Sequence, residues 1–148
     1  MYKKVIKYED YNGQEREEEF YFNINRAELA KMNFDHAGSF EEYCQRLIES
    51  RNVQELYALF EKLITMSYGR KSLDGKQFIK NEEYLKEFTQ SEAYAELITE
   101  FLTVNGAASD FINGILADTL AKIERQNAAN GTDKPQLTEV VQAESTVK

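Results

Sequence analysis

The sequence predicts an α+β protein in which an N-terminal β-hairpin packs on about five or six mostly short helices. Over residues 1–24 apolar side chains alternate with polar ones, which is typical of paired strands. Over residues 25–125 they recur at steps of three and four, which is typical of amphipathic helices. Residues 126–148 show neither period and include the only proline. We therefore expect one globular domain over 1–125 and a flexible tail over 126–148.

The expected hairpin is organised around Asn12-Gly13, a dipeptide that supplies the positive φ angles of a tight turn. One face of the two strands is apolar: Tyr2, Ile6 and Tyr8 on the first, and Phe20, Phe22 and Ile24 on the second. The charges of the two strands are complementary: Lys3, Lys4 and Lys7 against Glu15, Glu17, Glu18 and Glu19. Because a lone hairpin is marginally stable in water, its aromatic face must pack on the rest of the chain.

Helix starts are expected where a capping residue precedes an apolar stripe. Asn25, with Glu28 as its capping-box partner, starts a short helix through about Met32, and Ser39 starts a second. The third helix has the clearest stripe: Val53, Leu56, Tyr57, Phe60, Leu63 and Ile64. It should end near Tyr68, with Gly69 as its C-cap.

The C-terminal half is expected to contain three more helices after a polar loop over 70–76. Asn81 caps a short helix, Ser91 begins the next, and a last helix follows Asn105-Gly106. The stripe of this last helix consists of Phe111, Ile112, Ile115, Leu116, Leu120 and Ile123.

Composition narrows the function classes. The formal net charge is −8 and the pI is about 4.8, so the surface repels nucleic-acid phosphates and anionic lipid. No segment has the run of ~20 apolar residues that a membrane span needs. Cys44 is the only cysteine, which excludes an intramolecular disulfide. We expect a cytoplasmic protein whose partners are other proteins.

Two side chains are candidates for chemistry. His36 is the only histidine, and without cysteine or histidine co-ligands we interpret it as a solvated loop residue. Cys44 lies on an apolar helix face beside Leu47 and Ile48, which favours a buried, inert thiol, although a dyad with His36 stays open at this stage.

Two charged segments are candidates for binding. The cluster from Glu15 to Glu19 lacks the ligand spacing of a calcium loop, so we interpret it as the solvated face of a strand. The loop over 69–80 has two glycines and four basic residues but lacks the spacing of a phosphate-binding loop. It is expected to be a turn between helices or a basic contact patch. We assign no catalytic, cofactor-binding or metal-binding residue and expect no cofactor.

Aromatic side chains at helical spacing are a further candidate for binding. They are Phe60, Phe88, Phe101 and Phe111. Such residues usually form a core, but in a small helical protein some can line a groove for a partner helix.

Three segments in this order resemble the tail assembly chaperones of long-tailed phages and prophages of Gram-positive bacteria. They are Asp10 to Gly13 leading into Glu18 to Asn23, then Ser67 to Lys80, and finally Phe88 to Leu97. The resemblance covers the chain to about Asp118. It implies a protein of the host cytoplasm, absent from the mature virion. Such a protein binds and solubilises the tape measure protein and helps to recruit subunits of the tail tube, the major tail protein. A longer, frameshifted form is common in this family.

Two other classes of function are also compatible with the sequence. A structural virion component, such as a head–tail connector or tail completion protein, would also be small and acidic. An enzyme would use Cys44 or the glutamate cluster, but no base, orienting group and oxyanion donors can be assembled around either. Self-association into rings or spirals would suit a protein that coats a rod.

Overall fold

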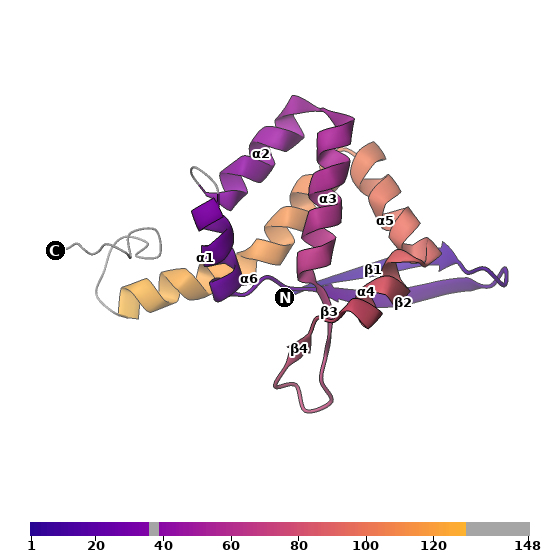
Figure 1. The fold of residues 1–148 in the computed structure, drawn as a ribbon, viewed down its shortest axis with the longest axis horizontal. Helices are drawn as coiled ribbons and strands as arrows, with labels where there is room; N and C mark the ends of the chain where they lie inside the picture. The colour runs from indigo at the N-terminus through magenta and orange to yellow at the C-terminus, as the bar shows by residue number, and fades with distance from the viewer. Residues whose placement is uncertain (36–38, 130–148) are drawn as a thin grey trace.

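The computed structural model describes residues 1–35 and 39–129, in which four strands and six helices form (Figure 1). Residues 36–38, with His36, and residues 130–148 lie outside the described residues. The elements in chain order are β1 (Tyr2–Glu9), β2 (Glu15–Phe22), α1 (Arg26–Asp35), α2 (Phe40–Ser50), α3 (Val53–Ser67), β3 (Tyr68–Lys71), β4 (Phe78–Ile79), α4 (Glu82–Thr89), α5 (Glu92–Thr103) and α6 (Ala107–Ala129). The predicted α+β class is confirmed.

The N-terminal hairpin forms as expected and is the start of a larger sheet. β1 pairs antiparallel with β2 from Tyr2 opposite Phe22 to Glu9 opposite Glu15. β2 then pairs with β3, and β3 with β4, so the strand order is β1-β2-β3-β4. The sequence missed the last two strands, because the segment over 69–80 was expected to be a loop.

The hairpin turn has a positive φ angle at only one of the two residues expected to supply it. Gly13 has φ +80°, but Asn12 does not adopt a positive φ. Gly13 donates its N–H to the Asp10 carbonyl and Asp10 donates to the Gln14 carbonyl, which describes a type I turn followed by a left-handed glycine. The Asp10 carboxylate also accepts the N–H groups of Asn12 and Gln14. These local bonds make the turn rigid without a left-handed asparagine.

The expected C-cap at Gly69 is wrong. α3 ends at Ser67, and the chain continues directly into β3 with Tyr68 in an extended conformation. Gly69 pairs with Tyr21 of β2, and a Cβ at Gly69 would lie 2.6 Å from the carbonyl oxygen of Ile79. Glycine is needed here because β4 passes close to the backbone of β3.

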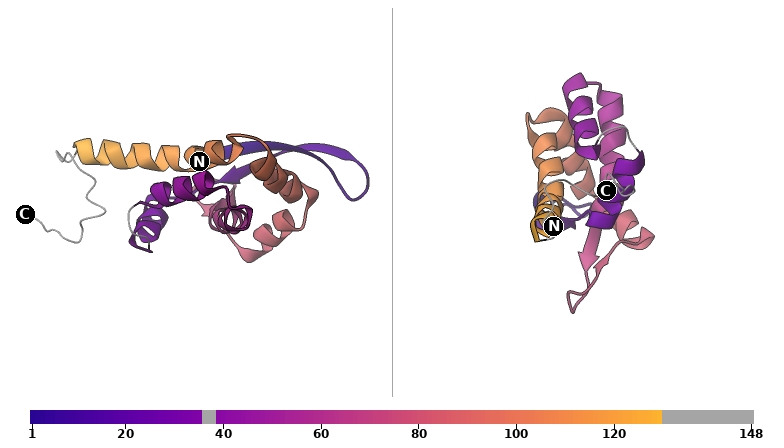
Figure 2. Two further views of the ribbon diagram at one scale, coloured as in Figure 1. Left: turned by 90° about the horizontal axis from the view of Figure 1, so that it is seen from above. Right: turned by 90° about the vertical axis from the view of Figure 1, so that its left-hand side faces the viewer.

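The core is a continuous group of aromatic rings between the sheet and the helices. Phe22 of β2 is fully buried, and its ring centroid lies 5.8 Å from Tyr68, 5.9 Å from Phe88 and 5.1 Å from Phe111. Phe111 contacts Phe101 at 4.5 Å. Rings from β2, β3, α4, α5 and α6 therefore meet, and the helices α5 and α6 cover the inner face of the N-terminal hairpin (Figures 1 and 2).

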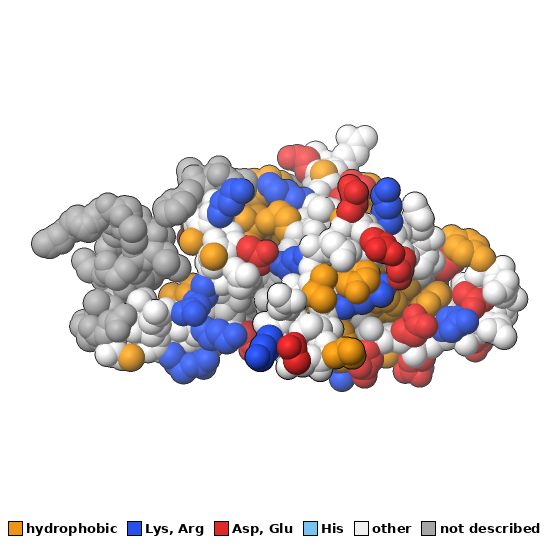
Figure 3. All heavy atoms as spheres, turned by 60° about the horizontal axis from the view of Figure 1, so that its bottom comes forward, with side chains coloured by type: hydrophobic (Ala, Val, Ile, Leu, Met, Phe, Trp, Pro, Cys, Tyr) orange, Lys and Arg blue, Asp and Glu red, His pale blue; other side chains and the backbone are white. Residues whose placement is uncertain are grey.

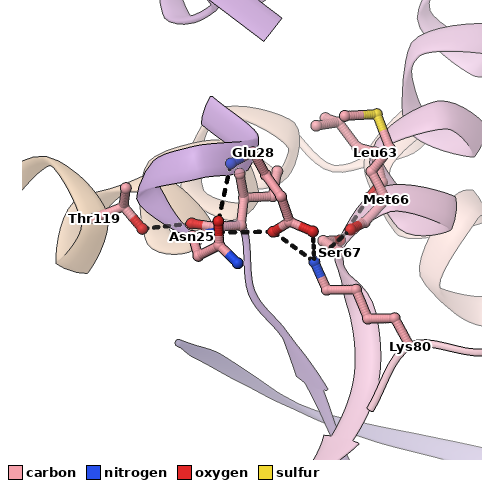
Figure 4. A network of polar contacts seen from close by, with 8 residues as sticks. Asn25, Glu28, Leu63, Met66, Ser67, Lys80 and Thr119 are labelled. Atoms are coloured by element: carbon pink, nitrogen blue, oxygen red, sulfur yellow. Dashed lines mark hydrogen bonds and ion pairs between the residues drawn. The ribbon is translucent and has the colours of Figure 1, made fainter. Parts of the chain in front are cut away.

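A polar network joins α1 to the remainder of the fold (Figure 4). Asn25 and Glu28 form the expected capping box, with both bonds at 2.9 Å. Lys80, just after β4, donates to both carboxylate oxygens of Glu28 at 2.8 Å and to the carbonyl of Met66 at 2.7 Å. The buried Thr119 of α6 donates to the carbonyl of Ile24. The segment that follows β2 is thus anchored to α3, β4 and α6.

Most of the expected helix caps are confirmed. The C-terminal end of the last helix differs from the expected position. The side chains of Ser39 and Asn81 accept the N–H groups of Glu42 and Tyr84 at the starts of α2 and α4. The last helix, α6, runs to Ala129, so the helical body continues past the expected limit at residue 125 (Figure 2).

Phe22→Ala should lower the free energy of unfolding by about 3–5 kcal/mol, because it leaves a cavity among rings from several elements. Val5, which is 44% exposed on β1, provides the control. Val5→Ala should cost less than about 1 kcal/mol. Chemical denaturation followed by circular dichroism measures both, and equal losses would contradict this account of the core.

Candidate protein-interaction surface

Cys44 has the environment of an inert thiol. It lies on α2 with no exposed surface, and burial, with the nearby charge of Glu41, raises its pKa to about 12. At neutral pH almost no thiolate forms, so the side chain is a poor nucleophile. The dyad with His36 is not tested, because His36 lies outside the described residues.

The cluster from Glu15 to Glu19 is divided between the two faces of β2. Glu18 lies on the inner face, where its carboxylate accepts the Tyr8 hydroxyl at 2.6 Å. Burial and this bond raise the pKa of Tyr8 to about 12. Glu19 lies on the outer face, 3.3 Å from Lys3, and Glu17 is opposite Lys7. Within the described ranges, no three His, Cys, Asp or Glu side chains gather closely enough to hold a metal ion.

The basic residues of the segment 69–80 do not form one patch. Arg70 binds Glu87 of α4 at 2.6 Å and stacks on the Tyr84 ring at 4.1 Å. Lys80 is engaged by Glu28 on α1. Lys71, the last residue of β3, lies 5.5 Å from the centre of the Tyr21 ring on β2, and Lys76 lies within the turn between β3 and β4. The four cations of the expected basic contact patch are therefore spread over different neighbours.

The turn between β3 and β4 projects from the body (Figure 1). It contains Leu73. Leu73 is fully exposed, at 109% of its reference area. The turn around it is ordered: the Ser72 N–H donates to the Gln77 carbonyl at 2.9 Å, and the Asp74 carboxylate accepts from the Ser72 hydroxyl and the Lys76 N–H. We call residues 72–77 the Leu73 turn. These hydrogen bonds hold the backbone of the turn, while the Leu73 side chain packs against no other described residue.

A second apolar surface lies where the α2–α3 corner meets the α5–α6 corner. A hollow of about 470 Å³ opens there to solvent. Its apolar lining includes Ile48, Val53, Leu56, Leu102 and Val104. We call this hollow the corner groove. Three of these side chains are substantially exposed: Val53 at 61%, Val104 at 54% and Leu102 at 37%.

Apart from Phe101, which is buried beside it, the corner groove consists of residues that the sequence analysis did not single out as a site. The four phenylalanines considered for a partner groove are instead buried: Phe60, Phe88, Phe101 and Phe111. Val53 and Tyr57 belong to the expected stripe of α3, yet both are exposed, while Leu59 is buried in their place. One sequence feature could have indicated this groove: an apolar residue stands next to each of the two helix corners. Val53 follows the α2–α3 corner, and Val104 lies in the α5–α6 corner.

Charge is unevenly distributed over the surface. Figure 3 shows acidic side chains gathered toward the end of the β1–β2 hairpin and basic ones near the opposite end, which α6 forms. At that end Arg26 donates to Gln126, and Lys122 and Arg125 lie near Asp118. None of the described helices is long and apolar enough to cross a membrane. Exposed aliphatic side chains on this charged surface include Leu73 and those of the corner groove.

The sequence was compared with models of known protein families. A model described as phage tail assembly chaperone matches residues 1–147. The chain belongs to this family. Its members are a non-catalytic kind of protein, which agrees with a buried thiol and a divided glutamate cluster. Neither a curated protein nor a solved structure matches the chain. The resemblance found in the sequence is therefore confirmed for the family of tail assembly chaperones. The match does not extend to the type of phage or to its host.

The native thiol should be almost unreactive toward a disulfide reagent such as dithiobis(nitrobenzoate). Burial and a pKa near 12 withhold the thiolate, whereas the unfolded chain should react at the rate of a free cysteine. Absorbance of the released thiolate, with and without denaturant, measures both rates. Rapid native reaction would show that Cys44 is accessible and would reopen the nucleophile hypothesis.

Proposed function

We propose that this chain binds and solubilises the tape measure protein during phage tail assembly and helps to recruit tail tube subunits. Membership of the tail assembly chaperone family supports a role in building the tail. The observation that carries the choice of partner surface is the corner groove, a hollow on an acidic body in which exposed aliphatic side chains lie beside polar ones such as Arg51 and Asn105.

The corner groove suits the apolar face of a helix. Helix-in-groove recognition uses aliphatic side chains that are exposed before binding and covered afterwards. Val53, Leu102 and Val104 meet this description. A tape measure protein is a long helical rod with apolar stripes, so covering those stripes keeps it from aggregating. Each buried side chain of this size contributes roughly 1.5–3 kcal/mol when it leaves water.

The net charge of −8 supports the solubilising role. A complex coated with copies of an acidic domain repels other such complexes, which opposes precipitation. The polar surface outside the corner groove and the Leu73 turn then faces water. We propose that the protein acts in the host cytoplasm and leaves the tail before the virion is complete.

Co-expression with the tape measure protein tests the partner. The wild-type chain should keep the tape measure soluble and retain it in a pull-down. Val104→Asp should abolish both effects, because a carboxylate in the corner groove must be desolvated on binding. Tyr11→Asp is the matched control, since Tyr11 is 77% exposed at the distant hairpin turn and the added charge is the same. Failure of the wild-type chain to retain the tape measure would refute the proposal, and equal retention by Val104→Asp would exclude the corner groove.

Purified virions separate the chaperone role from the alternative of a structural component. Quantitative mass spectrometry should find the chain far below the stoichiometry of the tail tube protein. A connector or tail completion protein would instead be present in a fixed number of copies in each particle. Stoichiometric recovery would therefore contradict the proposed departure from the tail.

A further inference from the structure

We propose that the free edge of β2, over residues 15–20, binds an extended segment of another protein that carries lysine or arginine at every second position. The segment is added to the sheet as a further strand. The backbone groups of this edge select an extended polypeptide, and the carboxylates beside it select the basic side chains. The contact goes beyond the proposed function and does not depend on it, because it uses a different surface from the corner groove.

Most of β2 has no neighbouring strand on the side away from β1. Among the described residues, β3 pairs with β2 only at Tyr21 and Phe22. Beyond that point β3 pairs with β4 instead, at Arg70 and Lys71, and the two hairpins diverge (Figure 1). The remainder of β2, from Glu15 to Phe20, is therefore an open edge, about 20 Å long at the usual rise per residue of a strand.

The strand register shows which backbone groups point to this edge. The N–H of Asp10 donates to the Gln14 carbonyl at 2.8 Å, one step beyond the last pair of the two strands. Because hydrogen-bonded pairs alternate along an antiparallel ladder, the even-numbered residues of β2 bond with β1. The N–H and C=O groups of Glu15, Glu17 and Glu19 therefore point away from β1. A row of donors and acceptors with this spacing fits the backbone of an extended chain.

This edge lacks the usual features that prevent pairing with another chain. Free edges are commonly closed by proline, by a β-bulge or by a covering helix. The pairing of β1 with β2 runs without a bulge from Tyr2 to Glu9, and β2 contains no proline. The helix α5, which covers the hairpin, packs mainly along β1. An uninterrupted and open edge of this length can accept another strand.

A hollow beside the edge provides room for the side chains of an added strand. Its volume is about 580 Å³, and residues 18–21 and 68–71 line it. Phe20 is half-buried there, with its ring centroid 4.9 Å from that of Phe88 and 6.4 Å from that of Tyr68. Side chains on the inner face of the added strand would meet this ring. Apolar residues are therefore favoured at the positions between the basic ones.

The outer face of the β1–β2 hairpin has more carboxylates than cations. Its ionisable side chains are those of Glu9, Glu15, Glu17 and Glu19 against Lys3 and Lys7. Lys3 is already paired with Glu19 at 3.3 Å, and Glu9 and Glu15 occupy opposite positions, where like charges repel. Figure 3 shows the resulting acidic end of the molecule. Lysine or arginine on the same face of an added strand would offset this repulsion.

The two cations that line the hollow are engaged with other groups. Arg70 binds Glu87 of α4 at 2.6 Å, and Lys71 lies 5.5 Å from the centre of the Tyr21 ring. Both belong to the end of the hollow where β3 is still close to β2. The part of the edge nearer the hairpin turn thus keeps its acidic character, which disfavours an acidic segment and attracts a basic one.

Amide hydrogen exchange on the full chain, followed by nuclear magnetic resonance, tests the edge directly. The probe is the synthetic peptide acetyl-Lys-Val-Lys-Val-Lys-Val-amide. Without peptide, the N–H groups of Glu17 and Glu19 should exchange fast and that of Glu18 slowly, because only Glu18 bonds with β1. With an excess of peptide all three should be protected. Continued fast exchange of Glu17 and Glu19, or protection before the peptide is added, would overturn the proposal.

Two N-methylated forms of the peptide show whether its backbone is used. In an antiparallel addition, the lysines share a face with Glu15 and Glu17 and direct their N–H groups at β2, whereas the valine N–H groups point to solvent. Methylation of the lysine amides should therefore abolish binding, and methylation of the valine amides should preserve most of it. Fluorescence anisotropy of labelled peptides measures both affinities. The two forms have the same charge and composition, so equal binding would indicate a purely electrostatic contact and overturn strand addition.

Variants of the chain separate the charge of the edge from its backbone. Glu17→Gln should weaken binding of the unmethylated peptide roughly two- to fivefold, because one cross-strand charge pair is lost. Glu17→Pro should weaken it about tenfold or more, because the N–H that points to the added strand is also lost. Val5→Pro is the matched control, since the N–H of Val5 points to the opposite edge of the sheet, and its affinity should stay that of the wild type.

Circular dichroism verifies that both proline variants keep the fold. Equal peptide affinities of Glu17→Pro and Val5→Pro would contradict the proposal, and the methylated peptides decide it on the wild-type chain if either variant unfolds. Folded Glu17→Pro should still retain the tape measure protein in the pull-down. The peptide contact and the proposed function can therefore fail independently of each other.

Discussion

The packing of Phe22 between the sheet and the helices is the interaction on which the rest of the structure depends. Its ring contacts Tyr68, Phe88 and Phe111, which belong to three elements far apart in the sequence. Through Phe111 and Phe101 the contact extends to Phe60 on α3. Because aromatic rings bury large apolar areas in defined geometries, this group fixes where α3, α4, α5 and α6 lie relative to the hairpin.

The direct passage from α3 into β3 gives the molecule its asymmetry. Ser67 ends α3, its carbonyl accepts the N–H of Asn23 at 2.8 Å, and β3 continues along β2. The start of α3 is therefore at one end of the molecule, and the β3–β4 hairpin leaves from the other (Figure 1). An apolar groove at the first end and an exposed leucine at the second are geometric consequences of this connection.

Acidic charge and exposed apolar side chains have separate roles in this account. The carboxylates are paired with lysine, arginine or tyrosine, as in Glu18 with Tyr8, or are solvated. Among the described residues they form no cluster of three that could hold a metal ion. The proposed recognition rests on a few aliphatic side chains at helix corners, which are exposed on a surface that is otherwise largely polar. Under the proposed function this combination lets the protein cover apolar stripes of its partner while its charge opposes precipitation.

The sequence by itself determined the features that depend on neighbouring residues. The hairpin follows from period-two alternation, and the starts of α1, α2 and α4 follow from Asn25, Ser39 and Asn81, whose side chains bond the backbone three residues on. It also indicated the family, through the order of three segments. The strands β3 and β4 were missed because each is short and is stabilised by distant partners.

Only the tertiary structure decided which apolar residues are buried. Gly69 has the appearance of a helix cap, but the approach of Ile79 makes it part of a strand. The stripe of α3 is broad, so contact with α2 and α5 selects Leu59 for the core and leaves Val53 exposed. Leu73 lies in the expected polar loop, where its neighbours already indicated an exposed position. The physical reason is that burial depends on what the rest of the chain places against a side chain, whereas capping and alternation depend on the few residues beside it.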